Sequence, residues 1–448
     1  PRTDCVTLVR RVSLDLVGLP PEPALADRFC ENPSQAHYES IVDSLLASNR
    51  FGEKWASMWL DLARYADTKG YERDPHRTIW KYRDWVIRAL NQDVPFDRFT
   101  VEQLAGDLLP DPSKEQLVAT AYHRNTMTNT EGGTSNEEYR VAAVIDRVNT
   151  TMEVWQGTTM ECVQCHSHPY DPFRHEEFYR LYAFFNQTKD NDRADERPRL
   201  PTFPEEHREK GVELRNEIQR LQARIDSLAG TPELVRQRTR WDSTLRAIMS
   251  SAVDVKRLDR LEMSEVPEDV LQVIKAPGGD RLVEILKIIN TPPSERAHSE
   301  KRQVIQYYTE IAEELAPIRK KLEKKKEQLA ELDPVRTPIM QELPEGQRRV
   351  TQVFKRGNWL TKGDTVQPDV PNSLHAWPEE APKNRLGLAR WIASEENPLT
   401  ARVTVNRFCA KVFGTGIVNT LSDFVTQGAE PTHPALLDWL AVQFMSAY

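Results

Sequence analysis

The chain has 448 residues, of which 29% are charged, and its formal net charge is -8 at pH 7. This length is too great for one small core, so we expect two or three units. The negative charge argues against nucleic acid as the main partner. No run of about 18 apolar residues is present to span a bilayer.

Residues 1–190 are predicted to form a mostly helical unit. Apolar side chains recur there every three or four residues, which is the period of a helix with one buried face. The predicted helices are a first segment that ends at Gly18, followed by 38–46, 51–65, 80–90 and 100–109. Their aromatic residues, such as Trp55 and Trp85, are more typical of an ordinary core than of a cofactor pocket.

The most informative motif follows, at Cys162-Val163-Gln164-Cys165-His166. C-x-x-C-H is the attachment pattern of c-type haem, in which two thiols bond the haem vinyl groups and the imidazole is the proximal iron ligand. We therefore predict one covalent haem c, held by Cys162, Cys165 and His166. The alternatives are half of a zinc site, a redox-active dithiol or two buried cysteines.

The ligand on the other face of the iron is sought in the polar segment 123–133. His123 offers a nitrogen and Met127 a thioether, and the glycines that follow allow the backbone to approach closely. We therefore expect a functional pocket where 123–133 meets 162–171. His/Met ligation would favour electron transfer, whereas an open sixth position would favour catalysis.

Other histidines are weaker candidates. His168 is too near His166 to reach the opposite face of the same iron, so it is assigned either to supporting a ligand or to binding another metal. His175 and His433 are more typical of structural histidines. Among the remaining cysteines, Cys5 and Cys30 are free to pair in an oxidising compartment.

Residues 205–335 differ from the rest of the chain. Two arms carry apolar residues at heptad spacing with charged residues between them: Leu214, Ile218, Leu221, Ile225 and Leu228, then Ile311, Leu315, Ile318, Leu322, Leu329 and Leu332. Between the arms, Gly230, Pro232, Gly278-Gly279 and Pro292-Pro293 interrupt the pattern. This predicts an antiparallel coiled-coil hairpin that acts as a spacer or a docking or oligomerisation arm, without chemistry of its own.

Residues 336–448 predict a third unit. Alternation at 350–354 indicates a strand, and the prolines near 363–371 exclude a helix there. Helices are predicted at 384–393, 400–413 and 434–445, and we expect the unit to be cut short at Tyr448. The fold class is thus mainly α, with two helical domains flanking the hairpin and a few short strands.

Segments across both flanking domains resemble the paired DUF1549/DUF1553 proteins, a cytochrome c-like (PSD1) family that is abundant in planctomycetes. The matching segments are 11–21, 51–72, 81–110, 123–133, 146–151 and 162–186, then 356–371, 397–408 and 413–441. The resemblance implies two conserved domains around a variable helical insertion, in a protein exported from the cytosol. Relatives often carry a further cytochrome domain upstream.

The motif and the resemblance together predict a periplasmic or otherwise extracytoplasmic haem protein, because c-type attachment takes place outside the cytosol. It would transfer electrons to a redox partner protein or catalyse haem-dependent oxidoreduction. An extracellular carbohydrate is the suggested substrate, and this suggestion rests only on association at the level of the family. Two other classes stay open: a non-haem scaffolding protein stabilised by a metal, and a metal-dependent hydrolase that uses His123, His166, His168 and nearby carboxylates.

Overall fold

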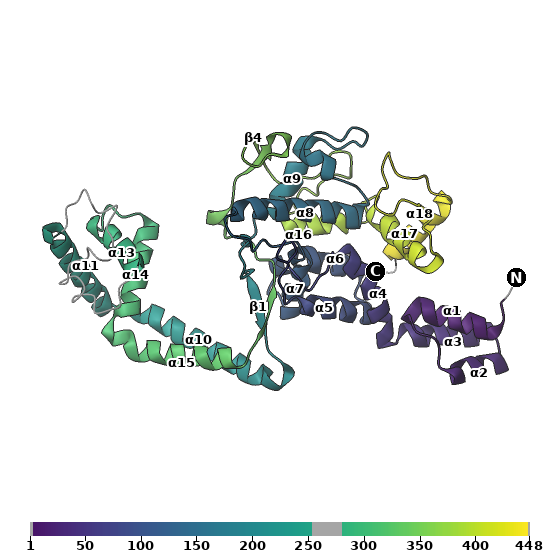
Figure 1. The fold of residues 1–448 in the computed structure, drawn as a ribbon, viewed down its shortest axis with the longest axis horizontal. Coiled ribbons are helices and arrows are strands. Elements are labelled where there is room, and N and C mark those ends of the chain that lie inside the picture. The colour runs from purple at the N-terminus through teal and green to yellow at the C-terminus, as the bar shows by residue number, and fades with distance from the viewer. Residues whose placement is uncertain (1–2, 253–279, 447–448) are drawn as a thin grey trace. The chain divides into compact units, whose positions relative to one another are not determined.

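The structure, a computed structural model, describes residues 3–252 and 280–446. It is mainly helical, as predicted, with two small two-stranded sheets among these residues (Figure 1). The chain forms two compact units: residues 1–201 together with 335–448, here called unit 1, and residues 202–334, here called unit 2. In the part of the chain described, no helix is both long and apolar enough to cross a membrane.

Unit 1 begins with three short helices, α1 (Cys5–Val17), α2 (Pro23–Glu31) and α3 (Gln35–Leu46). Val9, Phe29 and Ile41 form their core. The first helix ends where the sequence predicted, because Gly18 adopts a left-handed conformation with φ +73° and its N–H caps Leu14. Cys5 and Cys30 are joined by a disulfide.

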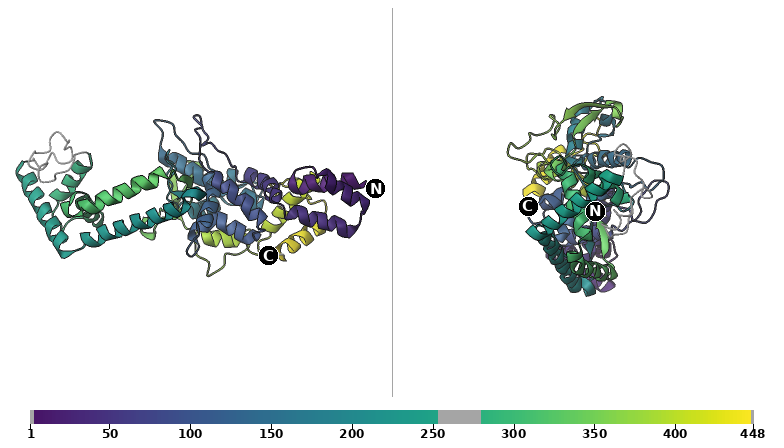
Figure 2. Two further views of the ribbon diagram at one scale, coloured as in Figure 1. Left: turned by 90° about the horizontal axis from the view of Figure 1, so that it is seen from below. Right: turned by 90° about the vertical axis from the view of Figure 1, so that its left-hand side faces the viewer.

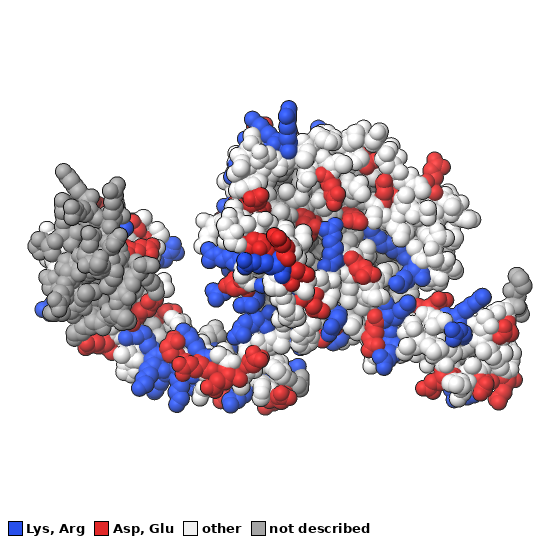
Figure 3. Space-filling view, viewed as in Figure 1, with Lys and Arg blue, Asp and Glu red and all other residues white. Residues whose placement is uncertain are grey.

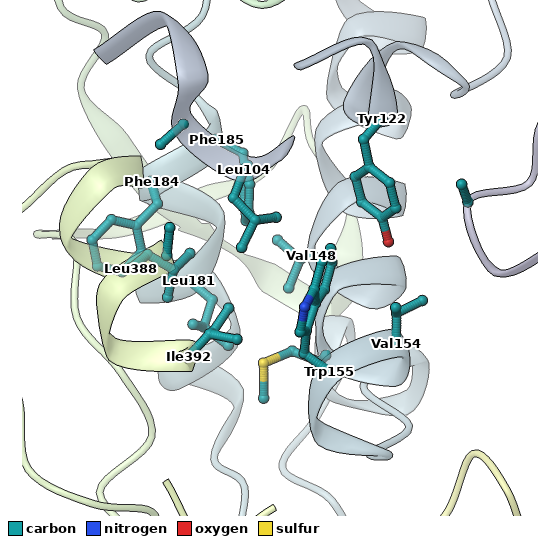
Figure 4. Close-up of a cluster of buried hydrophobic side chains, with 14 of the residues drawn as sticks. Leu104, Tyr122, Val148, Val154, Trp155, Leu181, Phe184, Phe185, Leu388 and Ile392 are labelled. Atoms are coloured by element: carbon teal, nitrogen blue, oxygen red, sulfur yellow. The ribbon is translucent and has the colours of Figure 1, made fainter. Parts of the chain in front are cut away.

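The main core of unit 1 lies between helices from both ends of the chain. They are α4 (Asn49–Leu62), α5 (Trp80–Asn91), α6 (Phe96–Ala105), α7 (Lys114–Ala119), α8 (Asn136–Gln156), α9 (His175–Phe185) and α16 (Arg385–Ile392). Figure 4 shows Leu104, Val148, Trp155, Phe184 and Ile392 packed together from four of them. Of the aromatic residues on the N-terminal helices, Trp59 and Trp85 belong to this buried core, whereas Trp55 lies outside it and, with Trp59, lines an apolar pocket of about 260 Å³.

A buried ion pair also joins the two flanking regions. Arg385 on α16 is fully buried and bonds the carboxylates of Asp107 and Glu342 at 2.7 and 2.9 Å. Removal of either acid would leave a buried guanidinium partly unpaired, which is costly. The regions expected as separate first and third domains therefore share one core and one polar network.

Short strands complete unit 1. Strand β1 (Arg199–Thr202) lies beside β2 (Val335–Pro338), and β3 (Thr351–Phe354) pairs antiparallel with β4 (Lys362–Val366). The predicted strand near 350–354 corresponds to β3. Towards the C-terminus, α17 (Thr400–Phe413) packs against α18 (Pro434–Ser446). These two helices also match the ranges that the sequence predicted.

In unit 2 the first heptad arm forms α10 (Arg208–Ala229) and most of the second forms α15 (Ala316–Glu331), and these two long helices lie side by side (Figure 2). The second arm is not one helix as predicted, because Ile311 ends the preceding helix and Leu315 lies in a 3-10 turn. Lys325, which interrupts the apolar pattern, pairs with Glu217 of the other arm at 2.5 Å. The region between the arms is more than the broken linker expected. It forms α11 (Pro232–Ala252), α13 (Asp280–Asn290) and α14 (His298–Ile311), with a core that includes Trp241, Leu245 and Ile289. Gly278-Gly279, expected as a break, lies outside the described residues.

Candidate functional site

The C-x-x-C-H motif lies on a surface turn of unit 1. A short 3-10 turn spans Glu161–Gln164, and the N–H groups of Cys165 and His166 both donate to the carbonyl of Cys162, at 3.3 and 3.4 Å. Val163 is fully buried and anchors the turn in the main core. Because its neighbours point away from that core, both thiols and the His166 side chain are exposed.

Helix α9 fixes the position of this turn. His175, at its first residue, has Nδ1 at 2.8 Å from the carbonyl of Val163 and Nε2 at 3.1 Å from the carbonyl of Phe354 on β3. One turn later, the Tyr179 hydroxyl donates to the carbonyl of Gln164 at 2.8 Å. In a neutral ring only one His175 nitrogen carries a hydrogen, so the ring donates to one of these carbonyls and lies in contact with the other. Together with the bond from Tyr179, this position holds the turn against α9.

The segment after β3 reaches one of the sulfurs directly. Gly357 has φ +72°, and a Cβ at this position would lie 2.6 Å from Sγ of Cys165. Two demands therefore require glycine here: a left-handed backbone and an approach too close for a side chain. The motif spacing gave no sign that a residue almost 200 positions away touches a cysteine of the pair.

One ring nitrogen of His166 faces a backbone carbonyl. Its Nδ1 lies 2.8 Å from the carbonyl oxygen of Ser167. A carbonyl only accepts, so Nδ1 carries the proton and, in the neutral ring, Nε2 keeps its lone pair. Metal-binding histidines are commonly oriented in this way, with one nitrogen donating to a backbone carbonyl and the other facing the metal.

His168 has the opposite arrangement, although it is only two residues away. Its Nδ1 accepts the backbone N–H of Asp171 at 2.8 Å, so the proton of the neutral ring is on Nε2. The His168 side chain is only 8% exposed. Asp171 is itself buried and accepts the N–H of Thr426 at 3.0 Å. His168 therefore shapes the loop after the motif and joins it to the 426 region.

His123 lies at the other end of α9 from the motif. Its ring makes edge contacts with Tyr122 and with Phe185, the last residue of that helix. Since His175 and Phe185 are separated by ten positions on α9, these two ends are about 15 Å apart along the axis. His123 is buried, and its Nε2 has no hydrogen-bond partner. Burial, with smaller contributions from Arg147 and Arg385, lowers the pKa of His123 well below its usual range.

Met127 also lies away from the motif. It is 53% exposed, and its side chain packs on Gly70. The loop around it bonds to other segments: Thr128 donates to the carbonyl of Lys69 at 2.9 Å, and Asn129 donates to Asp192 at 3.1 Å. The sequence led us to expect a pocket where 123–133 meets 162–171. The structure places these two segments apart, so that prediction is wrong. The segment 123–133 instead contacts Phe185 on α9 and loops at Lys69 and Asp192, and no local sequence pattern shows these pairings.

Further ligands are not gathered near the motif. Across residues 3–252 and 280–446, no three His, Cys, Asp or Glu side chains are close enough together to hold a metal ion. His433, the last candidate, has Nδ1 at 3.1 Å from the hydroxyl of its neighbour Thr432. The described site therefore consists of two thiols and one imidazole on a well-supported turn.

Comparison with protein families gives two matches. Residues 1–190 match PSCyt2, a protein of unknown function (DUF1549), and residues 384–448 match PSD1, a protein of unknown function (DUF1553). The first match contains the C-x-x-C-H turn and α9, and the second contains Thr426. No curated protein and no solved structure matches the chain.

Proposed function

For this chain with a DUF1549 segment and a DUF1553 segment, we propose that Cys162 and Cys165 attach one haem c and that Nε2 of His166 is its proximal ligand. The protein would act in electron transfer or haem-dependent oxidoreduction outside the cytoplasm. The observation that carries the proposal is the bond from Nδ1 of His166 to the Ser167 carbonyl, beside two exposed thiols. A haem bound here would supply one-electron redox chemistry.

The residues around the motif support attachment in three ways. The exposed thiols are accessible to a bulky planar reactant, which buried cysteines would not be. The bonds from His175 and Tyr179 hold the turn in place, so little ordering of the backbone is required on binding. Gly357 leaves the space that Cys165 occupies free of side-chain atoms.

The disulfide supports a location outside the cytoplasm. Cys5 and Cys30 are bonded, and disulfides persist mainly in oxidising compartments. Haem c attachment requires reduced thiols in that same compartment, and Cys162 and Cys165 are not joined by a disulfide.

A direct test is to express the protein in a periplasm that contains a haem c attachment system. A haem stain on a denaturing gel should follow the chain, because thioether bonds survive denaturation. Cys162→Ala combined with Cys165→Ala should abolish the stain, whereas Cys409→Ala, which removes the third free thiol, should leave it unchanged. An intact mass without added haem under these conditions would overturn the proposal.

A further inference from the structure

A second candidate site lies in unit 1, among different residues. A pocket of about 520 Å³ opens beside β1. Its lining includes five cationic side chains, those of Lys189, Arg193, Arg197, Arg199 and Arg336, and one carboxylate, that of Asp195. In Figure 3 Lys and Arg side chains lie among Asp and Glu side chains over this part of unit 1, so the excess of cations belongs to the lining of the pocket and not to the whole face.

Most of the pocket comes from one irregular segment, 189–199, which turns at 193–196, where the N–H of Glu196 donates to the carbonyl of Arg193 at 2.8 Å. Lys189, Arg193, Arg197 and Arg199 are exposed. Asp190 and Glu196 are buried. The segment therefore places two of its carboxylates in the core and four of its cations at the surface, beside the pocket.

Buried arginines bind this segment on its core-facing side. Arg147 pairs with Asp190 at 2.6 Å, and Arg77 pairs with Glu196 at 2.8 Å. Arg124 donates to the backbone carbonyls of Glu196 and Ile339, at 3.0 and 2.8 Å. The inward carboxylates are thus neutralised in the core, and the backbone that carries the outward cations is fixed in place.

The outward cations have little compensation within the lining. Asp195 pairs with Arg197 at 2.8 Å and is the one acidic side chain among the described lining residues. Like charges held close together repel, so an anion between them would be bound favourably. Guanidinium groups suit oxyanions in particular, because they form two parallel hydrogen bonds to carboxylate, sulfate or phosphate.

We propose that this pocket binds a small molecule that bears two or more oxyanion groups. Its volume lies in the range of small-molecule sites, about 300–1,000 Å³, and several arginines around one space favour a multiply charged ligand over a single ion. The proposal does not depend on haem, because no pocket residue belongs to the C-x-x-C-H turn.

The test is titration calorimetry of the full chain with three probes: pyrophosphate, citrate and a sulfated disaccharide. The unsulfated disaccharide serves as the uncharged control. At least one charged probe should bind, and the strongest of the three identifies the oxyanion preferred. If none binds in low salt, where charge attraction is strongest, the proposal is overturned.

Matched variants test the location. Arg193→Gln combined with Arg199→Gln should weaken binding about tenfold or more, which corresponds to roughly 1.4 kcal/mol. Arg10→Gln combined with Arg11→Gln removes the same charge from exposed positions of α1 and should change the dissociation constant less than about twofold. Asp195→Asn should tighten binding, because it removes the carboxylate of the lining. Equal losses in the two double variants would place the binding outside the pocket.

Discussion

At the scale of single residues, the Nδ1 atoms of His166 and His168 have opposite hydrogen-bond roles. His166 donates from Nδ1 to a carbonyl, and His168 accepts an N–H at Nδ1. This difference agrees with the roles predicted from the sequence, in which His166 is the proposed ligand and His168 a supporting residue, and it gives His168 a place in the structure of the loop.

We expect substitutions at the two histidines to have different effects in the haem-loaded protein. His166→Ala should shift the Soret band, because it removes the proposed proximal nitrogen. His168→Ala should leave the band in place and lower the free energy of unfolding by about 1–3 kcal/mol, since the Asp171 N–H would lose its acceptor. His168→Asn, which offers an amide oxygen, should restore part of that loss. A Soret shift in His168→Ala as large as in His166→Ala would contradict the assignment.

His123 is predicted to make unit 1 sensitive to acid. Because burial lowers its pKa in the folded state, the unfolded chain binds more protons as the pH falls below about 6.5. Stability should therefore decrease with falling pH, at up to about 1.4 kcal/mol per pH unit from this residue. In His123→Leu this contribution should disappear, as measured by urea unfolding between pH 5 and pH 8. The same variant should keep the Soret band of the wild type, and a shift would instead place His123 on the iron.

At the scale of elements, the C-x-x-C-H turn depends on α9 and on the segment after β3. Val163, Gln164 and Cys165 each contact one of these elements. The motif itself spans five residues, but its support comes from residues up to almost 200 positions away. Changes in that support should therefore affect haem attachment without changing any ligand.

Gly357→Ala tests this dependence. The added Cβ would meet Sγ of Cys165, so we expect a lower yield of covalent haem and slower alkylation of that thiol. The matched control is Gly414→Ala, which has a similar left-handed backbone, φ +82°, but nothing within 4 Å of the added Cβ. Both variants should lose about 1 kcal/mol of stability from backbone strain. Equal haem yields in the two variants would show that contact with the sulfur does not matter.

At the scale of the whole molecule, unit 2 is inserted between two neighbouring strands of unit 1. The N–H of Ile339 donates to the carbonyl of Pro198 at 3.1 Å, and β1 and β2 lie beside each other. The chain therefore leaves unit 1 and returns to it at points about one strand spacing apart, roughly 5 Å.

A short Gly/Ser linker should be able to replace residues 202–334, because the two chain ends that it must join in unit 1 lie close together. We expect the shortened protein to keep its haem content and absorption spectrum, while binding to a redox partner or self-association decreases. Spectra and sedimentation of the two proteins measure these quantities. Loss of haem on this deletion would show that unit 2 contributes to the cofactor site.

The sequence was sufficient where structure depends on neighbours in the chain. Amphipathic periods predicted α3 and α5 to within a few residues, because each helix buries one face and exposes the other. Helices were also predicted at the positions of α17 and α18. Helix α8 was not predicted from an apolar period, because side chains are buried around most of its surface and these include Arg140 and Arg147. Where charged side chains pair inside the core, the apolar period is lost.

The sequence by itself thus determined the mainly helical class, the two heptad arms and the C-x-x-C-H motif, because each is written in residues a few positions apart. Only the tertiary structure decided which partners meet: His123 with Phe185, Met127 with Gly70, and Cys165 with Gly357. It also decided which nitrogen of His166 carries its proton. Contacts between distant segments depend on how apolar surfaces pack and how buried charges pair across the whole fold. A pattern of neighbouring residues does not show which distant segments will meet.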